Sequence, residues 1–303
     1  MGLPIKVRKE NAMKNNARLA VIGGDYRMLS CAKFMSRLGY EVSVFGYENY
    51  NGDFENLYMS DTLSDCIENS DILILPLPYS DAQGFIKSAY SHKRITLAEI
   101  LKICTSGKKI FGGCLDENFI NECRKLNITA VDYYKREELK VLNAIPTAEG
   151  AIAIAILETD ITLHECECAV LSFGCVGRAT ARALNSLGSI VTVVARSATA
   201  LSKAESLGYK SKHISDICAA LKGKKLIFNG IPDKVITESV LKELDKNTII
   251  IDLASKPGGV DLKEAEKYGI RVISALSLPS KYAPVTAGKY LAKTIDHILK
   301  GVE

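Results

Sequence analysis

The stretch "VLSFGCVGRATARAL", residues 170–184, predicts a strand, a glycine turn and a helix in immediate succession. In dinucleotide-binding folds this order brings bare backbone N–H groups and a helix N-terminus to a pyrophosphate. The usual fingerprint of such a turn is G-x-G-x-x-G. Here Ser172 stands at the first glycine position, followed by Gly174 and Gly177. The stretch therefore predicts a cofactor loop with one substitution, and a purely structural turn is the alternative.

The end of the next strand indicates which dinucleotide binds. The strand "IVTVVA" (190–195) is followed by Arg196 and Ser197. An NAD-binding unit places Asp or Glu here for the ribose 2′-hydroxyl, whereas a guanidinium and a hydroxyl suit a 2′-phosphate. We therefore expect NADP, with a solvated strand-end arginine as the alternative. The expected cofactor contacts are Ser172, Phe173, Gly174, Cys175, Val176, Gly177, Ala195, Arg196, Ser197, Asn229, Ala254 and Ser255.

Short β-branched runs alternate with helical patterns along the chain, which predicts an α/β fold with parallel sheets. The expected strands of the first half are 18–22, 41–45, 71–77, 108–112 and 128–133, and those of the second are 168–173, 190–195, 225–229, 248–254 and 271–275. We expect two doubly wound Rossmann-like domains. Residues 17–145 would form a flavodoxin- or Rossmann-like substrate domain, and residues 146–284 an NADP-binding Rossmann domain.

Two helices are expected to join these domains. The Ala/Ile-rich stretch 147–161 follows Pro146 and begins with Thr147, a capping residue, which predicts a long linking helix. Apolar residues spaced along 285–300 predict a final amphipathic helix that returns to the first domain and closes a cleft. Residues 1–16 are polar and unpatterned, and we interpret them as a flexible or non-native leader outside the fold.

Composition excludes several classes of protein. The 303 residues are 47% hydrophobic and 24% charged, as in globular proteins. The net charge of +4 is spread along the chain, which argues against nucleic-acid binding. No apolar run approaches the length of a membrane span, and the nine scattered cysteines form no zinc motif. We expect a cytoplasmic protein with no bound metal and no membrane partner.

The loops at the ends of the second set of strands are the expected place for chemistry. Lys256 and Lys281 are cations there, and Arg27 follows the first glycine turn, so these three are the expected ligands of a carboxylated substrate. Thr147 would add an anion-binding helix N-terminus, and Glu149 a general base. Lys256, Lys281 and Glu149 are the catalytic candidates. Ordinary solvated charges and a helix cap are the alternatives.

The positions of the histidines argue against assigning the chain to one class of dehydrogenase. Two-domain hydroxy-acid dehydrogenases use a histidine in a late loop as their acid/base, but "SLPSKYAP" (277–284) contains none. The four histidines lie at positions 92, 164, 213 and 297.

The stretches "GGDYR", "PTAEGAI", "LSFGCVGRATARAL", "VARS", "FNGIP", "IIDLASKPGGVD" and "LPSKYAPVTAG" follow one another between residues 18 and 298. Taken together they resemble the A-subunit family of the dipicolinate synthases of endospore-forming bacteria. Within that likeness, Ser172 replaces a position that is normally glycine, and Cys175 one that is often arginine or another larger residue.

The resemblance implies an NADP-dependent oxidoreductase of spore formation, active in the mother cell with the B subunit of dipicolinate synthase as partner. Its substrate would be the cyclic dicarboxylate 4-hydroxy-tetrahydrodipicolinate or its dihydro dehydration product, and its product pyridine-2,6-dicarboxylate. By analogy we expect a homo-oligomer. The alternatives are a relative of alanine or hydroxy-acid dehydrogenases, and an NADP-binding regulatory or structural subunit of the synthase.

Overall fold

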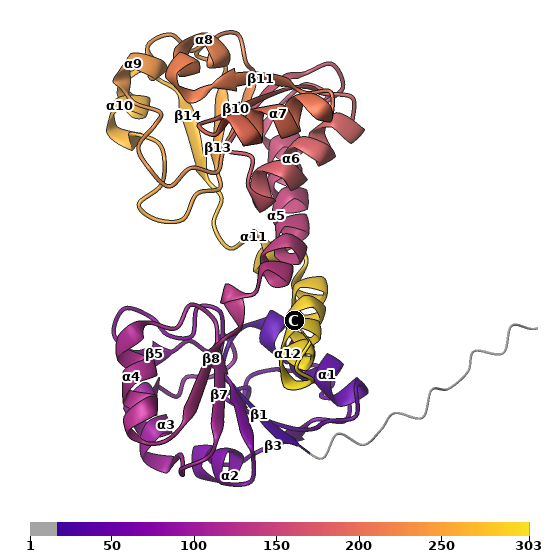
Figure 1. Ribbon diagram of the computed structural model, residues 1–303, viewed down its shortest axis with the longest axis vertical. Helices are drawn as coiled ribbons and strands as arrows, with labels where there is room; N and C mark the ends of the chain where they lie inside the picture. The colour runs from indigo at the N-terminus through magenta and orange to yellow at the C-terminus, as the bar shows by residue number, and fades with distance from the viewer. Residues whose placement is uncertain (1–16, 303) are drawn as a thin grey trace, which may run out of the picture. The chain divides into compact units, whose positions relative to one another are not determined.

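The computed structural model describes residues 17–302, which divide into two units (Figure 1). Unit 1 comprises the described residues up to Leu139 together with those from Pro284 onward, and unit 2 comprises Lys140–Ala283. The leader expected at residues 1–16 lies outside the described residues.

Unit 1 contains a sheet of six parallel strands in the order β3-β2-β1-β4-β7-β8. The strands are β1 Arg18–Ile22, β2 Glu41–Phe45, β3 Tyr58–Met59, β4 Ile72–Ile74, β7 Lys109–Gly112 and β8 Thr129–Asp132. A separate antiparallel pair is formed by β5 Phe85–Ile86 and β6 Ile95–Thr96. The helices of unit 1 are α1 Tyr26–Arg37, α2 Leu63–Glu68, α3 Leu97–Ile103, α4 Glu117–Lys125, the 3-10 turn η1 Tyr133–Lys135 and α12 Pro284–Leu299.

Alternation along the strands explains the two layers of helices in unit 1. On β1, Leu19 and Val21 join the core under α1 and α12, whereas Ala20 and Ile22 join the core under α2, α3 and α4. A strand with both faces covered in this way reads as a continuous apolar run, which is why "RLAVI" predicted it.

Unit 2 repeats the design with the strand order β11-β10-β9-β12-β13-β14, all parallel. The strands are β9 Glu167–Leu171, β10 Ile190–Ala195, β11 Lys210–His213, β12 Leu226–Asn229, β13 Ile249–Asp252 and β14 Arg271–Ser274. The helices are α5 Glu137–Glu158, which begins in unit 1, α6 Cys175–Ser186, α7 Ala198–Ser206, the 3-10 turn η2 Ile214–Asp216, α8 Ile217–Leu221, α9 Glu238–Leu241, α10 Leu262–Lys267 and α11 Leu278–Tyr282. The predicted fold class is confirmed.

The predicted linking helix exists, but its predicted start at Thr147 is wrong. Helix α5 begins at Glu137 and carries Pro146 in its interior. Proline has no N–H for the preceding turn, yet α5 continues through it, and the Thr147 hydroxyl donates to the carbonyl oxygen of Asn143 at 2.8 Å. Thr147 is therefore a residue inside the helix and not its cap.

Among the described helices, α5 alone is long and apolar enough to cross a membrane by length and composition. Its residues Ala151, Ile152 and Ala155 are buried in the core of unit 2. This buried face accounts for part of the apolar composition, while Ile156 and Leu157 near the end of the helix are exposed.

The last helix, α12, packs on α1 within unit 1, as Figure 1 shows. Gly288 lies at this contact, where an added Cβ would stand 2.4 Å from the carbonyl oxygen of Arg27 and 2.6 Å from Cβ of Ser30. Leu291 and Ile295 follow on the same helix and are buried in the unit 1 core. A residue without a side chain thus allows the two helix backbones to approach closely.

Gly288→Ala is expected to destabilise unit 1 by about 1–2 kcal/mol, because overpacking outweighs the better helix propensity of alanine. The measurement is the shift of the urea unfolding transition. Lys289→Ala, at the exposed next position of α12, is the control and is expected to stay within about 0.5 kcal/mol of the wild type. A Gly288→Ala protein as stable as the wild type would contradict this packing.

Candidate functional site

Four neighbouring strands of unit 2 end at the same level. Residues Val194, Leu171, Asn229 and Asp252 are paired in register across β10, β9, β12 and β13. The loops that follow them therefore leave from one edge of the sheet. The strand order reverses between β9 and β12, and ligands of doubly wound folds bind outside the carboxyl ends of strands at such a point.

The backbone of Ser172 has the conformation that is expected of a glycine at this position. Its φ is +86°, a region that favours glycine, and its N–H donates to the carbonyl oxygen of Val194 at 2.8 Å. An added Cβ on Gly177 would stand 2.2 Å from the carbonyl oxygen of Ser172. The turn therefore has the geometry of the fingerprint although its first glycine is missing.

Ser172→Gly is expected to stabilise unit 2 by about 0.5–1 kcal/mol, because relief of the strained φ exceeds the added freedom of the unfolded chain. Urea unfolding of the two proteins side by side measures this difference. A loss of stability would mean that the serine side chain contributes more than its backbone strain costs.

The N-terminus of α6 has room for a ligand. Its N-cap residue is Gly174, which is exposed and provides no side-chain cap. A Cβ added to Gly174 would have no neighbour within 4 Å among the described residues, apart from the two residues next to it in the chain. The N-terminus of α1 differs, because the carboxylate of Asp25 caps it by accepting from the N–H of Arg27. The described residues of the second glycine turn thus fit a pyrophosphate, whereas those of the first are already engaged with a carboxylate of the chain.

Arg196 is available at the same edge. Its side chain is 73% exposed, and its ion pair with Asp233 is long, at 3.9 Å. An exposed pair of this length contributes little, so an incoming phosphate competes with it easily. Ser197 is the N-cap of α7 but makes no side-chain cap, and its hydroxyl therefore remains available for a phosphate oxygen.

Two neighbours of Arg196 were missed by the sequence analysis. Asp233 follows β12, and His213 ends β11 with its Nε2 3.0 Å from the Arg196 carbonyl oxygen. The backbone N–H of Ser215 points to Nδ1 of His213 at 3.3 Å, which makes Nε2 the donor to that carbonyl in the neutral ring. Both residues are distant from Arg196 along the chain, and only the pairing of strand ends brings them together.

Several predicted cofactor contacts are buried and would act through their backbone. Phe173 is 7% exposed and packs edge-on against Tyr209, and Ala195 and Ala254 are also buried. Cys175 and Val176 lie half-buried in the first turn of α6, and Ser255 is exposed.

The side chain of Asn229, an expected cofactor contact, already has hydrogen-bond partners within the chain. The residue is fully buried, and its Nδ2 donates to Asp252 Oδ1 at 2.8 Å and to the carbonyl oxygen of Ile231 at 3.0 Å, while its Oδ1 accepts from the Ile231 N–H at 3.1 Å. Such a side chain has no donor left for a cofactor. Asp252, its partner, was missed by the sequence analysis although it lies in the quoted stretch "IIDLASKPGGVD".

Arg27, which we expected to bind substrate, also has partners within the chain. Its Nε and Nη2 make a bidentate ion pair with Asp25, at 2.7–3.1 Å, and Nη2 donates further to the carbonyl oxygen of Leu77 at 3.0 Å. Its side chain is only 13% exposed. Asp25, two residues earlier in the sequence, neutralises the charge that the prediction assigned to a substrate.

The remaining substrate candidates lie in unit 2. Lys256 is exposed in the loop 253–259, and Lys281 is exposed on α11. Glu149 is exposed in the middle of α5, next to Gly150, whose added Cβ would stand 3.0 Å from both Leu278 and Tyr282 of α11. Helices α5 and α11 are therefore in contact. Thr147 cannot supply the predicted helix N-terminus, since it lies inside α5.

Comparison with known proteins now identifies the fold and its relatives. Residues 18–134 match the family of the N-terminal domain of the dipicolinate synthase A subunit, and residues 147–302 match the alanine dehydrogenase/PNT C-terminal domain. The A subunit of dipicolinate synthase from Bacillus subtilis (strain 168) is 30% identical over 292 residues, which cover 96% of this chain and 98% of the relative. The chain belongs to the A-subunit family of dipicolinate synthases.

Two solved structures agree with this assignment. The crystal structure of the dipicolinate synthase A chain from Bacillus subtilis is 31% identical, with a TM-score of 0.86 over 97% of this chain and 99% of that one. The structure of the A subunit from Bacillus halodurans is 32% identical, with a TM-score of 0.84 over 93% and 97% of the two chains. The dehydrogenase-type second domain implies an oxidoreductase with a nicotinamide cofactor, and the family's name implies a further subunit.

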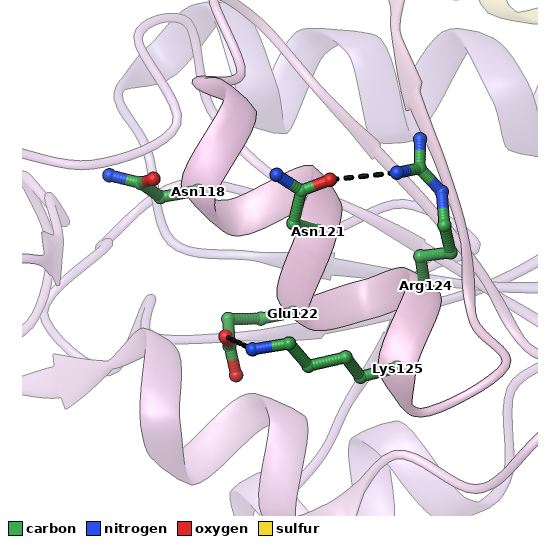
Figure 2. A pocket seen from close by; sticks show the side chains of 5 residues that line it. All are labelled: Asn118, Asn121, Glu122, Arg124 and Lys125. Atoms are coloured by element: carbon green, nitrogen blue, oxygen red, sulfur yellow. Dashed lines mark hydrogen bonds and ion pairs between the residues drawn. The ribbon is translucent and has the colours of Figure 1, made fainter.

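A hollow elsewhere on this family member is not part of the site. A hollow of about 520 Å³ lies on α4 and is lined by exposed side chains of that helix. Figure 2 shows these side chains. Arg124 donates to Asn121 at 2.7 Å and Lys125 to Glu122 at 2.6 Å, both one turn apart. These are the side-chain pairs of a solvated helix face. Among residues 17–302, no group of three or more His, Cys, Asp or Glu side chains is arranged to hold a metal ion.

Proposed function

We propose that this chain is an NADP-dependent oxidoreductase that forms pyridine-2,6-dicarboxylate from 4-hydroxy-tetrahydrodipicolinate or its dihydro dehydration product, together with the B subunit of dipicolinate synthase. Membership of the A-subunit family supports the reaction class. The observation that carries the choice of cofactor is the combination, at one sheet edge, of the uncapped α6 N-terminus with the exposed Arg196.

Different residues of unit 2 would bind different parts of the cofactor. The N–H groups at the start of α6 would bind the pyrophosphate, and the absence of a Cβ on Gly174 lets the backbone approach it. Arg196 and Ser197 would bind the 2′-phosphate. The cofactor, when bound, supplies the hydride acceptor.

The substrate is a ring with two carboxylates, and cations must hold it. Lys256 and Lys281 are the candidates in unit 2, while Arg27 is set aside because Asp25 already neutralises it. Oxidation of the dihydro ring breaks one C–H bond with loss of a hydride and releases one proton as the ring becomes aromatic. Glu149 is the proposed acceptor of that proton. Little other acid/base help is needed, and positioning supplies most of the rate enhancement.

Cellular context follows from the same proposal. We place the protein in the cytoplasm of the mother cell during sporulation, as a homo-oligomer that associates with the B subunit. The competing proposal is that the chain only binds NADP and supports a catalytic partner.

An assay with the purified chain separates the two proposals. The chain is mixed with NADP⁺ and enzymatically generated substrate, first alone and then with the B subunit, and NADPH and pyridine-2,6-dicarboxylate are measured together. Stoichiometric formation of both by the chain alone supports the oxidoreductase. NADP⁺ binding without turnover in either mixture would contradict it. Turnover that needs the B subunit and keeps its KM in Lys256→Ala would favour the supporting role.

Lys256→Ala is expected to raise KM for the substrate at least about tenfold, the loss of one charge-assisted contact, while the Kd of NADP⁺ changes little. Lys263→Ala, an exposed lysine on α10, is the control of equal charge change. Unchanged turnover and KM in Lys256→Ala would exclude this lysine from the substrate site.

A further inference from the structure

Asp252 is a buried carboxylate whose hydrogen bonds all point into its own loop and its neighbouring strand. The residue is 6% exposed and ends β13. Its Oδ1 accepts from Asn229 Nδ2 at 2.8 Å and from the N–H of Ala254 at 3.2 Å, and its Oδ2 accepts from the N–H of Gly259 at 3.1 Å. Within residues 17–302 no lysine, arginine or histidine forms an ion pair with it.

Asn229 orients this carboxylate from the next strand. Its amide group is held on the other side by Ile231, through one donated and one accepted hydrogen bond. The Asn229 side chain therefore cannot turn away from Asp252 without losing all three bonds. Because β12 and β13 are paired in register at these two residues, the Asn229–Asp252 pair joins two adjacent strand ends.

The Asn229–Asp252 pair explains why two glycines stand at the end of "DLASKPGG". An added Cβ on Gly259 would stand 2.1 Å from Asn229 Nδ2 and 2.3 Å from the carbonyl oxygen of Ile231. Gly258 has a φ of +91°, and its Cβ would stand 2.9 Å from Asp252 Oδ2. The backbone of loop 253–259 therefore lies directly against the pair, and bonds to Asp252 hold it at Ala254 and at Gly259.

A buried carboxylate that has no neighbouring cation does not maximise the stability of the folded protein. Removing its hydration is costly, and apolar residues of similar size often stabilise a fold more. Three N–H donors compensate part of this cost through charge-assisted bonds. An apolar residue could not accept these hydrogen bonds. The carboxylate therefore fixes the backbone conformation of the loop in a way that an apolar residue cannot.

We propose that Asp252 and Asn229 are positioning residues, which fix loop 253–259 and through it hold Lys256 in place for the substrate. This inference rests on the proposed function, since Lys256 is there the cation that binds the dicarboxylate. The pair does not touch the substrate. It acts through the loop backbone, with Ala254 on one side of Lys256 and Gly259 on the other.

Amide hydrogen exchange on the full chain tests the pair without reference to any reaction. In the wild type, the amides of Ala254 and Gly259 are expected to be protected even though the loop between them is exposed. In Asp252→Asn one of the two acceptor oxygens is replaced by an NH₂ group. At least one of the N–H groups of Asn229, Ala254 and Gly259 therefore loses its acceptor. We expect protection at Ala254 or Gly259 to fall by about 10- to 100-fold, the usual effect of a bond to a charged group.

Asn229→Ala is the second variant, because it removes the orienting amide and keeps the charge. It is expected to lower protection at the same two amides. Asp245→Asn, which removes a carboxylate paired with Lys225 at 3.5 Å elsewhere in unit 2, is the control and should leave both unchanged. Unprotected amides in the wild type would overturn the proposal even if neither variant folds. Unchanged protection in folded variants would also overturn it.

Kinetics of the same proteins with the proposed substrate tests the consequence for the site. Corrected for the folded fraction, Asp252→Asn is expected to raise substrate KM or lower kcat by about tenfold, because the pair holds the loop that carries Lys256. A merely structural role predicts no change after that correction, which would overturn the inference. A wild type that turns over nothing with or without the B subunit overturns the proposed reaction instead, and hydrogen exchange then still decides whether the pair holds the loop.

Discussion

Arg196→Asp is expected to weaken the binding of NADP⁺ by about 100-fold or more, through the loss of charge-assisted hydrogen bonds and the repulsion of a new carboxylate. NAD⁺ binding should stay the same or improve, because an acidic residue at the end of β10 suits the ribose 2′-hydroxyl. The structure supports this expectation, since the arginine is exposed and held only by a long pair with Asp233. Isothermal titration of both nucleotides measures the two effects.

The control for this variant is Arg182→Asp, which makes the same charge change at an exposed position of α6 in the same unit. Long-range electrostatics would weaken NADP⁺ binding in both variants to a similar degree. Equal losses, or no loss in Arg196→Asp, would remove Arg196 from the phosphate site.

Gly177→Ala is expected to lower the stability of unit 2 by about 2–3 kcal/mol and to abolish cofactor binding in the protein that remains folded. Its Cβ would stand 2.2 Å from the carbonyl oxygen and 2.9 Å from the carbonyl carbon of Ser172. These are backbone atoms, so the clash cannot be relieved by a side-chain rotation and must move the turn against α6. Urea unfolding and nucleotide titration of the same preparation measure both effects.

Gly174→Ala is the matched variant, because its added Cβ meets no other group within 4 Å. Its stability should stay within about 0.5 kcal/mol of the wild type, since only the weaker N-cap preference of alanine acts. Its cofactor binding should nevertheless fall, because the methyl group occupies the space that the pyrophosphate needs. Normal binding by Gly174→Ala would show that no ligand approaches this turn closely.

Apart from the short antiparallel pair β5–β6, which it did not predict, sequence alone predicted ten of the twelve described sheet strands, because strands covered on both faces read as unbroken apolar runs. The two that it missed, β3 and β11, lie at the edges of their sheets. Strand β3 has two residues, and β11 reads "KSKH" with no fully buried residue. The other two edge strands, β8 and β14, contain apolar residues and were predicted, so it is the short length of β3 and the polar composition of β11 that leave them indistinguishable from loops.

The sequence predicts those residues of the candidate site that belong to one local motif. Ser172, Gly174, Gly177 and Arg196 follow from the spacing of one strand, one turn and the next strand, and the structure brings them to one edge. The hydrogen bond between Asn229 and Asp252 could not be predicted, because the two residues belong to different strands and no local pattern reveals a bond between strand ends. The start of α5 was misplaced because proline usually marks a helix boundary, and here the helix continues through Pro146.

The central claim is that the turn from Ser172 to Gly177 binds NADP, and thermal unfolding with each nucleotide tests it most directly. A ligand bound only by the folded state at 100 times its Kd adds about 2.7 kcal/mol of stability and raises the unfolding midpoint. We expect a clear rise with NADP⁺, a much smaller one with NAD⁺ at equal concentration, and loss of the difference in Arg196→Asp. No rise with either nucleotide, or equal rises with both, would contradict it.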